Sequence, residues 1–135
     1  MTKRSIHLIV FLFPGLIVAA GCNNPSPENG SDLRLEATGD PGVEAHLVVK
    51  RDGNLICTTN LLTPGLASWS GDDFEITCTP AGKPGHLRIR THIRDSETSL
   101  DANEPGTVLK ITLHHNVIES TTTDSSGTAV SQSRF

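Results

Sequence analysis

The sequence has few aromatic residues and no strong excess of charge of either sign. Its 135 residues include four Phe, one Trp and no Tyr, so a hydrophobic core must be built mainly from Leu, Ile and Val. The formal net charge of −4 at pH 7 lacks the basic balance that is typical of proteins that bind nucleic acid. A chain of this length forms one domain at most.

The sequence also lacks the motifs of several common catalytic classes. It contains no Gly-x-Ser-x-Gly nucleophile elbow, no His-Glu-x-x-His zinc-binding pair and no glycine-rich phosphate loop. Ser, His and Asp are all present, but their spacing does not single out a catalytic triad. We therefore expect a protein that is not an enzyme and that uses no cofactor.

The longest apolar run lies near the N-terminus and ends abruptly. Residues 1–22 consist of a positively charged start, an apolar stretch and a few small residues before Cys22. This is the layout of a secretory signal. A membrane-spanning helix is the alternative. However, the apolar stretch is shorter than the ~20 residues that a bilayer requires. Pro14 and Gly15 also interrupt it.

The end of this segment, VAAGC, resembles the lipobox of bacterial lipoproteins, in which small residues precede an invariant Cys. The resemblance implies that the Cys22 sulfur carries lipid and that the chain is cut after Gly21, so that residues 1–21 are a signal peptide. Two or three acyl chains hold a protein at a membrane without a spanning helix. Asn23 replaces the Asp of an inner-membrane retention signal, which favours the outer membrane if the cell is Gram-negative.

Two polar segments flank the middle of the chain. Residues 22–31 are rich in Pro, Asn and Ser, which predicts a flexible tether behind the lipid. Residues 119–135 are rich in Ser and Thr and poor in apolar side chains, which predicts a disordered tail. The globular domain is therefore expected to span residues 32–118.

The three cysteines fit an exported protein. If lipid occupies Cys22, then Cys57 and Cys78 remain as an even pair. Oxidising compartments favour a disulfide between such a pair, and two buried thiols are the alternative. Neither cysteine belongs to a Cys-x-x-Cys pair, which argues against a metal site built on them. We predict a Cys57–Cys78 disulfide.

Short stretches of alternating apolar and polar residues fill residues 32–118. Leu33, Leu35 and Ala37 alternate with charged residues, and turn residues such as Asp52 and Gly53 separate the stretches. No stretch keeps a helical period over three turns. We predict an all-β fold, a small immunoglobulin-like β-sandwich of about seven antiparallel strands. The acidic segment 94–106 is expected to be a solvated loop.

The most unusual stretch is HLRIRTHIR. In a strand, five basic or titratable side chains would project from one face, with Leu87, Ile89 and Ile93 on the other. We call these five residues the basic row: His86, Arg88, Arg90, His92 and Arg94. Neighbouring strands would extend the row with His46 and Lys50, or with Lys110 and His114.

The basic row is a candidate binding site for an anionic lipid, an anionic polysaccharide or an acidic protein partner. Its charge should rise below about pH 6.5 as histidines gain protons. The alternative is an ordinary solvated face, neutralised by acids such as Glu44 and Glu75. In that case the protein is a purely structural envelope lipoprotein.

A third hypothesis is metal handling by His46, His92 and His114, if their strands are neighbours. His114 and His115 cannot chelate one ion in a regular strand, because adjacent side chains point to opposite faces. His115 is then expected to point, with Leu113, toward the core or its edge. We predict no metal site.

Overall fold

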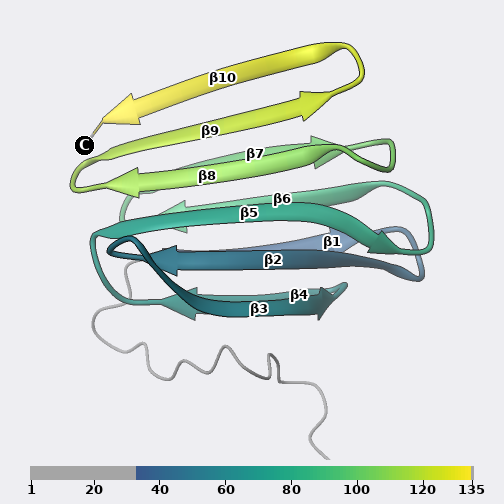
Figure 1. The fold of residues 1–135 in the computed structure, drawn as a ribbon, viewed down its shortest axis with the longest axis horizontal. Helices are drawn as coiled ribbons and strands as arrows, with labels where there is room; N and C mark the ends of the chain where they lie inside the picture. Colours follow the sequence, from purple (N-terminus) through teal and green to yellow (C-terminus); the bar gives the residue numbers. More distant parts are fainter. Residues whose placement is uncertain (1–32, 135) are drawn as a thin grey trace, which may run out of the picture.

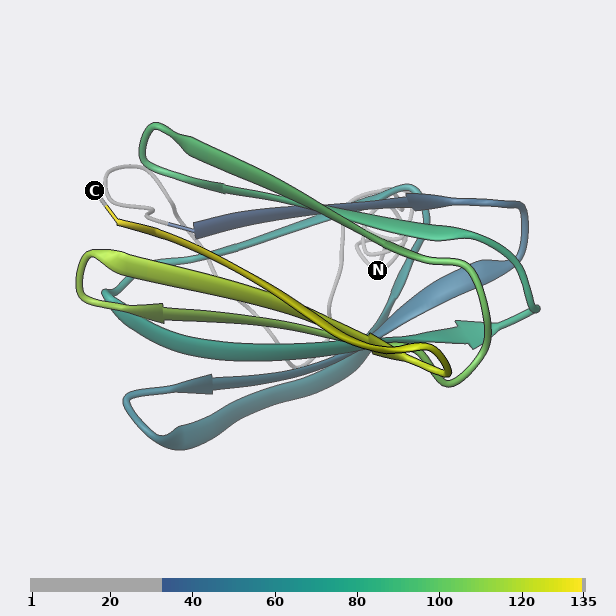
Figure 2. The same ribbon diagram turned by 90° about the horizontal axis from the view of Figure 1, so that it is seen from above.

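A computed structural model describes residues 33–134, which form two antiparallel sheets packed face to face (Figures 1 and 2). The predicted β-sandwich is confirmed. The ten strands of these residues are β1 (Leu33–Gly39), β2 (Val43–Arg51), β3 (Asn54–Leu62), β4 (Gly65–Trp69), β5 (Asp73–Gly82), β6 (Leu87–Ile93), β7 (Ser96–Ala102), β8 (Val108–His114), β9 (Val117–Asp124) and β10 (Gly127–Arg134).

The two sheets differ in width. The smaller has the strand order β4-β1-β6-β7 and the larger has the order β10-β9-β8-β5-β2-β3. Every pairing between neighbours is antiparallel. The larger sheet extends beyond the smaller one at the β10 side, which is the upper rim in Figure 1.

Period-two alternation builds the core between the sheets. On β2, Val43, Ala45, Leu47 and Val49 are buried, while the residues between them are more exposed. The same alternation holds along β6 and along the first part of β5. Phe74 is among the largest fully buried side chains, and its ring lies 6.5 Å from that of Trp69. The core is otherwise almost entirely aliphatic, as the shortage of aromatics predicts.

The predicted Cys57–Cys78 disulfide is wrong. Cys78 is a buried free thiol. Cys57 lies on β3 and Cys78 on β5, and β2 runs between these strands in the same sheet. Two strand spacings amount to ~9.5 Å, whereas a disulfide joins Cα atoms no more than about 7 Å apart.

In the sequence, Trp69 lies between Cys57 and Cys78, but these residues do not build the bridge between sheets that is typical of antibody domains. Both cysteines belong to the larger sheet, and Trp69 belongs to the smaller one. The likeness to immunoglobulin domains is limited to the packing of two antiparallel sheets.

Two segments expected to lack regular structure form strands. The segment 94–106, predicted to be a solvated loop, contains β7, which pairs with β6 along its whole length. Residues 119–134, predicted to belong to a disordered tail, form most of β9 and all of β10. The sandwich therefore continues well beyond residue 118.

The predicted signal peptide (1–21), the lipidated Cys22 and the tether (22–31) lie outside the described residues. Among residues 33–134, no helix is long and apolar enough to cross a membrane.

Candidate functional site

The basic row lies on and around β6, at the centre of the smaller sheet. Arg88, Arg90 and His92 project from its outer face, and the residues between them are buried. His86 immediately precedes the strand. Arg94 follows it, in the turn to β7, with a positive φ of 54°. The alternation predicted from the sequence is therefore correct for the strand itself, and Arg94 lies beyond its end.

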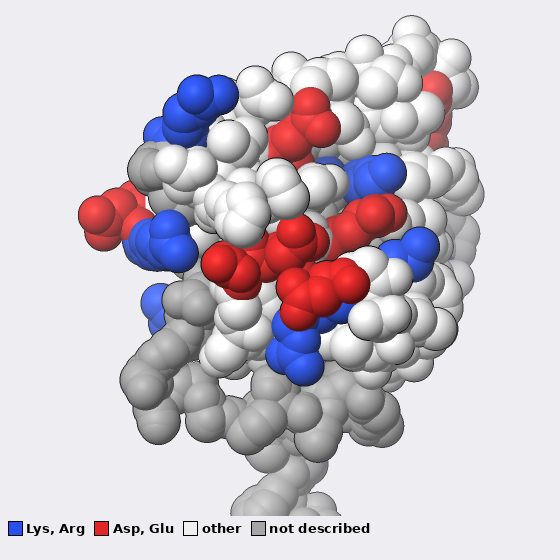
Figure 3. All heavy atoms as spheres, turned by 60° about the vertical axis from the view of Figure 1, so that its left-hand side comes forward, with Lys and Arg blue, Asp and Glu red and all other residues white. Residues whose placement is uncertain are grey.

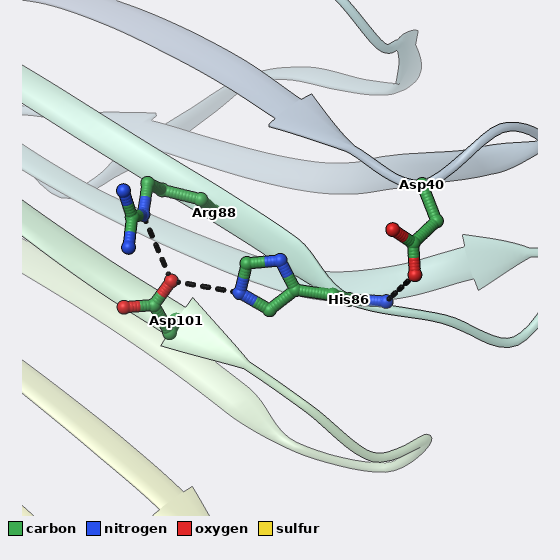
Figure 4. Close-up of polar contacts among 4 residues, drawn as sticks. All are labelled: Asp40, His86, Arg88 and Asp101. Carbon is green, nitrogen blue, oxygen red and sulfur yellow. Dashed lines mark hydrogen bonds and ion pairs between the residues drawn. The ribbon is translucent and has the colours of Figure 1, made fainter.

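His86 and Arg88 share one carboxylate. Asp101 on β7 lies opposite Arg88 in the strand register. Its Oδ1 atom accepts a hydrogen bond from Arg88 Nε at 2.9 Å and lies 2.9 Å from His86 Nε2 (Figure 4). Partial burial raises the pKa of Asp101, but the hydrogen bonds from Arg88 and His86 outweigh burial and hold the pKa below its ordinary value of 3.8.

The backbone around His86 is clamped by the turn that follows β1. The His86 N–H donates to Oδ2 of Asp40 at 2.9 Å (Figure 4), and the Asp40 N–H donates to the His86 carbonyl oxygen at 3.1 Å. A Cβ atom on Gly39 would lie 2.5 Å from that carbonyl oxygen, so only glycine allows this close approach. His86 is therefore held in place from both neighbouring strands.

Arg90 and His92 have acidic neighbours as well. Arg90 Nε lies 3.2 Å from Oε2 of Glu97 on β7, and Arg90 Nη1 lies 3.7 Å from Oε1 of Glu36 on β1. His92 Nε2 lies 3.9 Å from Oε2 of the same Glu97. All these side chains are between about a third and a half exposed, so solvent weakens each attraction.

The outer face of the smaller sheet is thus a mosaic of both signs. We call the six permanently charged side chains projecting from its strands the charged face: Arg34, Glu36, Arg88, Arg90, Glu97 and Asp101. Three arginines balance three carboxylates on this face, and its histidines add charge only when protonated. The expected acidic partners Glu44 and Glu75 are on strands of the other sheet, where Glu75 pairs with Lys110 at 3.6 Å.

The residues expected to extend the basic row lie on the wrong sheet. His46 and Lys50 are on β2, and Lys110 and His114 are on β8, and both strands belong to the larger sheet. The same division separates His92 from His46 and His114, so the histidines of the metal hypothesis are not brought together. His46 Nδ1 instead lies 2.7 Å from Oδ1 of Asn60. Among the described residues, no group of three or more His, Cys, Asp or Glu is placed to hold a metal ion.

The expectation that His115 points toward the core or its edge is wrong. His115 occupies the turn after β8 with a φ of 56°, and its side chain is 65% exposed. The positive φ brings its ring within 4.4 Å of the His114 ring, measured between centroids. The two rings face separate carboxylates, with His114 Nδ1 2.8 Å from Asp73 Oδ2 and His115 Nδ1 3.9 Å from Asp72 Oδ2.

These turns lie at the end of the sandwich shown on the left in Figure 1. Figure 3 shows that acidic side chains gather on this side of the molecule, with basic side chains among and around them. The β4–β5 loop is held against both neighbouring turns: the Asp52 N–H donates to the Asp73 carbonyl oxygen, and the His115 N–H donates to the Asp72 carbonyl oxygen. Sequence reasoning missed this cluster, because it treated HHN as a continuation of the strand.

Comparison of the chain with protein-family models, curated proteins and solved structures finds no match.

Proposed function

We propose that this chain is an exported, lipid-anchored envelope protein whose β-sandwich binds a protein partner through the charged face. Its activity is binding, with no chemical step. The observation that carries this proposal is the pairing of the β6 arginines with Asp101 and Glu97, which leaves a patterned face of both signs in place of a positive stripe.

The ion pairs between the β6 arginines and their carboxylate neighbours limit the kind of ligand that fits the charged face. A flexible anionic polymer or a lipid headgroup that approached Arg88 or Arg90 would meet the carboxylates of Glu36, Glu97 and Asp101. A protein surface with its own fixed charges can match both signs at once, and such complementarity provides specificity more than raw affinity. The rigid strands that carry these side chains reduce the ordering cost of binding.

The anchor rests on the resemblance of VAAGC to a lipobox. A lipid-bearing thioether and a disulfide are exclusive fates for the Cys22 sulfur. A Cys22 that carries lipid therefore cannot bridge to Cys57 or Cys78, the other two cysteines of the chain. The two fates are therefore chemically distinguishable.

The anchor is tested by the fate of Cys22. We expect metabolic labelling with a fatty-acid analogue to mark the protein, and Cys22→Ser to abolish the label and release the protein from membranes. Mass mapping of non-reduced peptides provides the second measurement. A Cys22–Cys57 disulfide in the purified protein, or a Cys22→Ser variant that stays membrane-bound, would overturn the anchor.

The charged face is tested by exchanging the charges of one ion pair. Arg88→Asp combined with Asp101→Arg keeps an opposite-charge pair on β6 and β7 but reverses its polarity. Chemical cross-linking in whole cells, read by immunoblot, should give a discrete adduct with the wild type and none with this double variant. The matched control is Glu75→Lys with Lys110→Glu, which makes the same exchange on the larger sheet and should leave the adduct unchanged.

Binding to lipid vesicles tests the alternative that the ligand is an anionic surface. We expect the protein to bind phosphatidylglycerol vesicles no better than neutral vesicles at neutral pH, because Arg88 and Arg90 on the charged face are already paired with carboxylates. Retention on anionic vesicles that the Arg88–Asp101 exchange removes would mean that the ligand is an anionic surface. An adduct that survives the exchange would exclude this face as the contact.

A further inference from the structure

No other strand of residues 33–134 covers the outer edge of β10. It pairs with β9 alone, and all eight of its residues are exposed. Figure 1 shows that it forms the rim of the larger sheet, and no strand of residues 33–134 lies on its other side. Its outer edge therefore presents backbone N–H and C=O groups without a strand partner, which is the usual template for strand addition.

The other three sheet edges carry features that hinder such pairing. The register between β2 and β3 shifts at Val49 and Lys50, and Pro64 lies just beyond β3. The β4 edge is only five residues long. On the β7 edge, two residues are acidic, and both are engaged with β6.

The β10 edge has none of these features. Its register with β9 runs from Gly127 to Arg134 without a shift. The strand GTAVSQSR contains no proline, and its single charge is Arg134 at the end. The upper part of the molecule in Figure 3, where β9 and β10 lie, is mostly free of acidic and basic side chains. Edge strands of this length normally carry charges or prolines that prevent association.

We propose that β10 is a self-association site, at which β10 of a second copy of this chain pairs antiparallel about a twofold axis. The two larger sheets then form one continuous sheet. A twofold interface uses the same strand twice, so the strand must be compatible with itself. This inference does not depend on the charged face or on the lipid anchor.

The sequence of β10 is compatible with itself in a register centred on Val130. A twofold axis perpendicular to the sheet keeps each side chain on its own face, so residues of the same parity must lie opposite each other. With Val130 opposite its counterpart, Thr128 faces Gln132 and Ala129 faces Ser131. Arg134 then lies opposite Ser126, so two like charges never meet. Val130, which is 59% exposed in one copy, packs against its twin.

A second copy fits this edge better than a charged partner does. Seven of the eight residues are uncharged, so neither an acidic nor a basic peptide finds complementary charge along the strand. Pairing two single strands buries less than about 1,000 Å², which places the interface among weak and transient ones. The dimer should therefore form only at high protein concentration.

Disulfide trapping tests the register. In the full-length chain carrying Val130→Cys, the two introduced thiols face each other across the axis, and oxidation should give a covalent dimer on a non-reducing gel. The matched control is Thr128→Cys on the same strand and face, where the two thiols are about 14 Å apart along the strands and should not join. The unsubstituted chain provides the background from native cysteines.

Sedimentation of the full-length chain tests the association itself, over concentrations up to about 1 mM. Val130→Lys places two like charges opposite each other and should weaken dimerisation at least about tenfold. Leu62→Lys, at a similarly exposed position on the β3 edge, should leave dimerisation unchanged.

A wild type that stays monomeric throughout this range would overturn the proposal. A dimer that Leu62→Lys disrupts and Val130→Lys does not would equally overturn it, because the contact would then lie at the opposite edge. Trapping of Thr128→Cys as efficiently as Val130→Cys would reject the register.

Discussion

Strands β2 and β10 are similar in length, but they are held in the fold by different forces. β2 has a neighbour on each side, and four of its side chains are almost completely buried between the sheets. β10 has one neighbour and no buried side chain. Backbone pairing alone holds it, so its side chains contribute almost nothing to the apolar pattern by which strands are recognised.

Strand β9 lies between these extremes. Its Ile118 and Ser120 are buried against the core, and the rest of the strand is more exposed. The turn to β10 is fixed by side chains: Asp124 Oδ1 accepts hydrogen bonds from the N–H and the hydroxyl of Ser126, and Glu104 Oε2 accepts one from the Ser125 N–H. The β9–β10 hairpin is therefore attached to the sandwich through β9 and this turn.

Thiol reactivity should show the largest contrast between the two regions. Burial raises the pKa of Cys78 to about 12, from an ordinary 9.0, so at mildly alkaline pH its thiolate fraction is about 10³-fold lower than that of an exposed thiol. Ser131→Cys places a thiol on exposed β10. A disulfide-exchange reagent should label the introduced thiol at least about 10³-fold faster than Cys78.

Denaturant is the control, because both thiols should react at similar rates in the unfolded chain. Fast labelling of Cys78 in the native protein would show that the core opens readily. The contrast between the two regions would then be wrong.

Stability should show the next largest contrast. Leu47 on β2 is fully buried, so Leu47→Ala should lower the free energy of unfolding by about 2–5 kcal/mol. Val130 on β10 is more than half exposed, so Val130→Ala should change it by less than about 0.5 kcal/mol. Urea denaturation of both variants in dilute solution measures the difference. Equal losses would mean that β10 is packed as tightly as the core.

The same contrast explains how much of the fold was predictable. β6 was predicted correctly because Leu87, Ile89 and Ile93 alternate with charged residues, and that alternation is a direct consequence of burying one face. β7 was predicted to be a loop because two of its five less exposed positions are the polar residues Ser96 and Thr98. β10 has no buried position, although the DSSG turn and the threonines before it are typical of a hairpin.

The candidate site was only half predictable for a related reason. Alternation determines which side chains share a face of one strand, and it located Arg88, Arg90 and His92 correctly. It contains no information on which sheet each strand joins. The carboxylates that pair with Arg88 and Arg90 were therefore not predicted, because Asp101 and Glu97 lie on β7, which the sequence pattern does not indicate as a strand. The prediction of a Cys57–Cys78 disulfide failed for the same reason, because β3 and β5, which carry these cysteines, belong to one sheet.

Two buried threonines differ in whether their hydroxyl groups are hydrogen-bonded. Thr91 on β6 is buried, and its Oγ1 has no hydrogen-bond partner among the described residues. Thr91→Val should therefore raise the free energy of unfolding by about 1 kcal/mol. Thr107 is equally buried, but its Oγ1 donates to the Glu104 carbonyl oxygen at 2.8 Å.

Thr107→Val is the matched substitution, and it should lower the free energy of unfolding by about 1 kcal/mol. Thermal or urea unfolding of both variants measures the opposite signs. A Thr91→Val variant that is less stable than the wild type would show that the Thr91 hydroxyl has a partner after all.

The smallest expected effect concerns Asp101, on the exposed face of the smaller sheet. Asp101→Asn removes the carboxylate next to Arg88 and His86, and because Asp101 is 37% exposed, solvent limits the loss to about 1 kcal/mol or less near neutral pH. The folded protein lowers the pKa of Asp101, so its contribution is present above the ordinary value of 3.8 and is lost as the pH falls through the lower folded value. The difference in urea midpoint between wild type and variant should therefore shrink in strong acid. A difference that stays constant into strong acid would mean that the asparagine disturbs packing, and that the ionised carboxylate does not stabilise this edge of the sandwich.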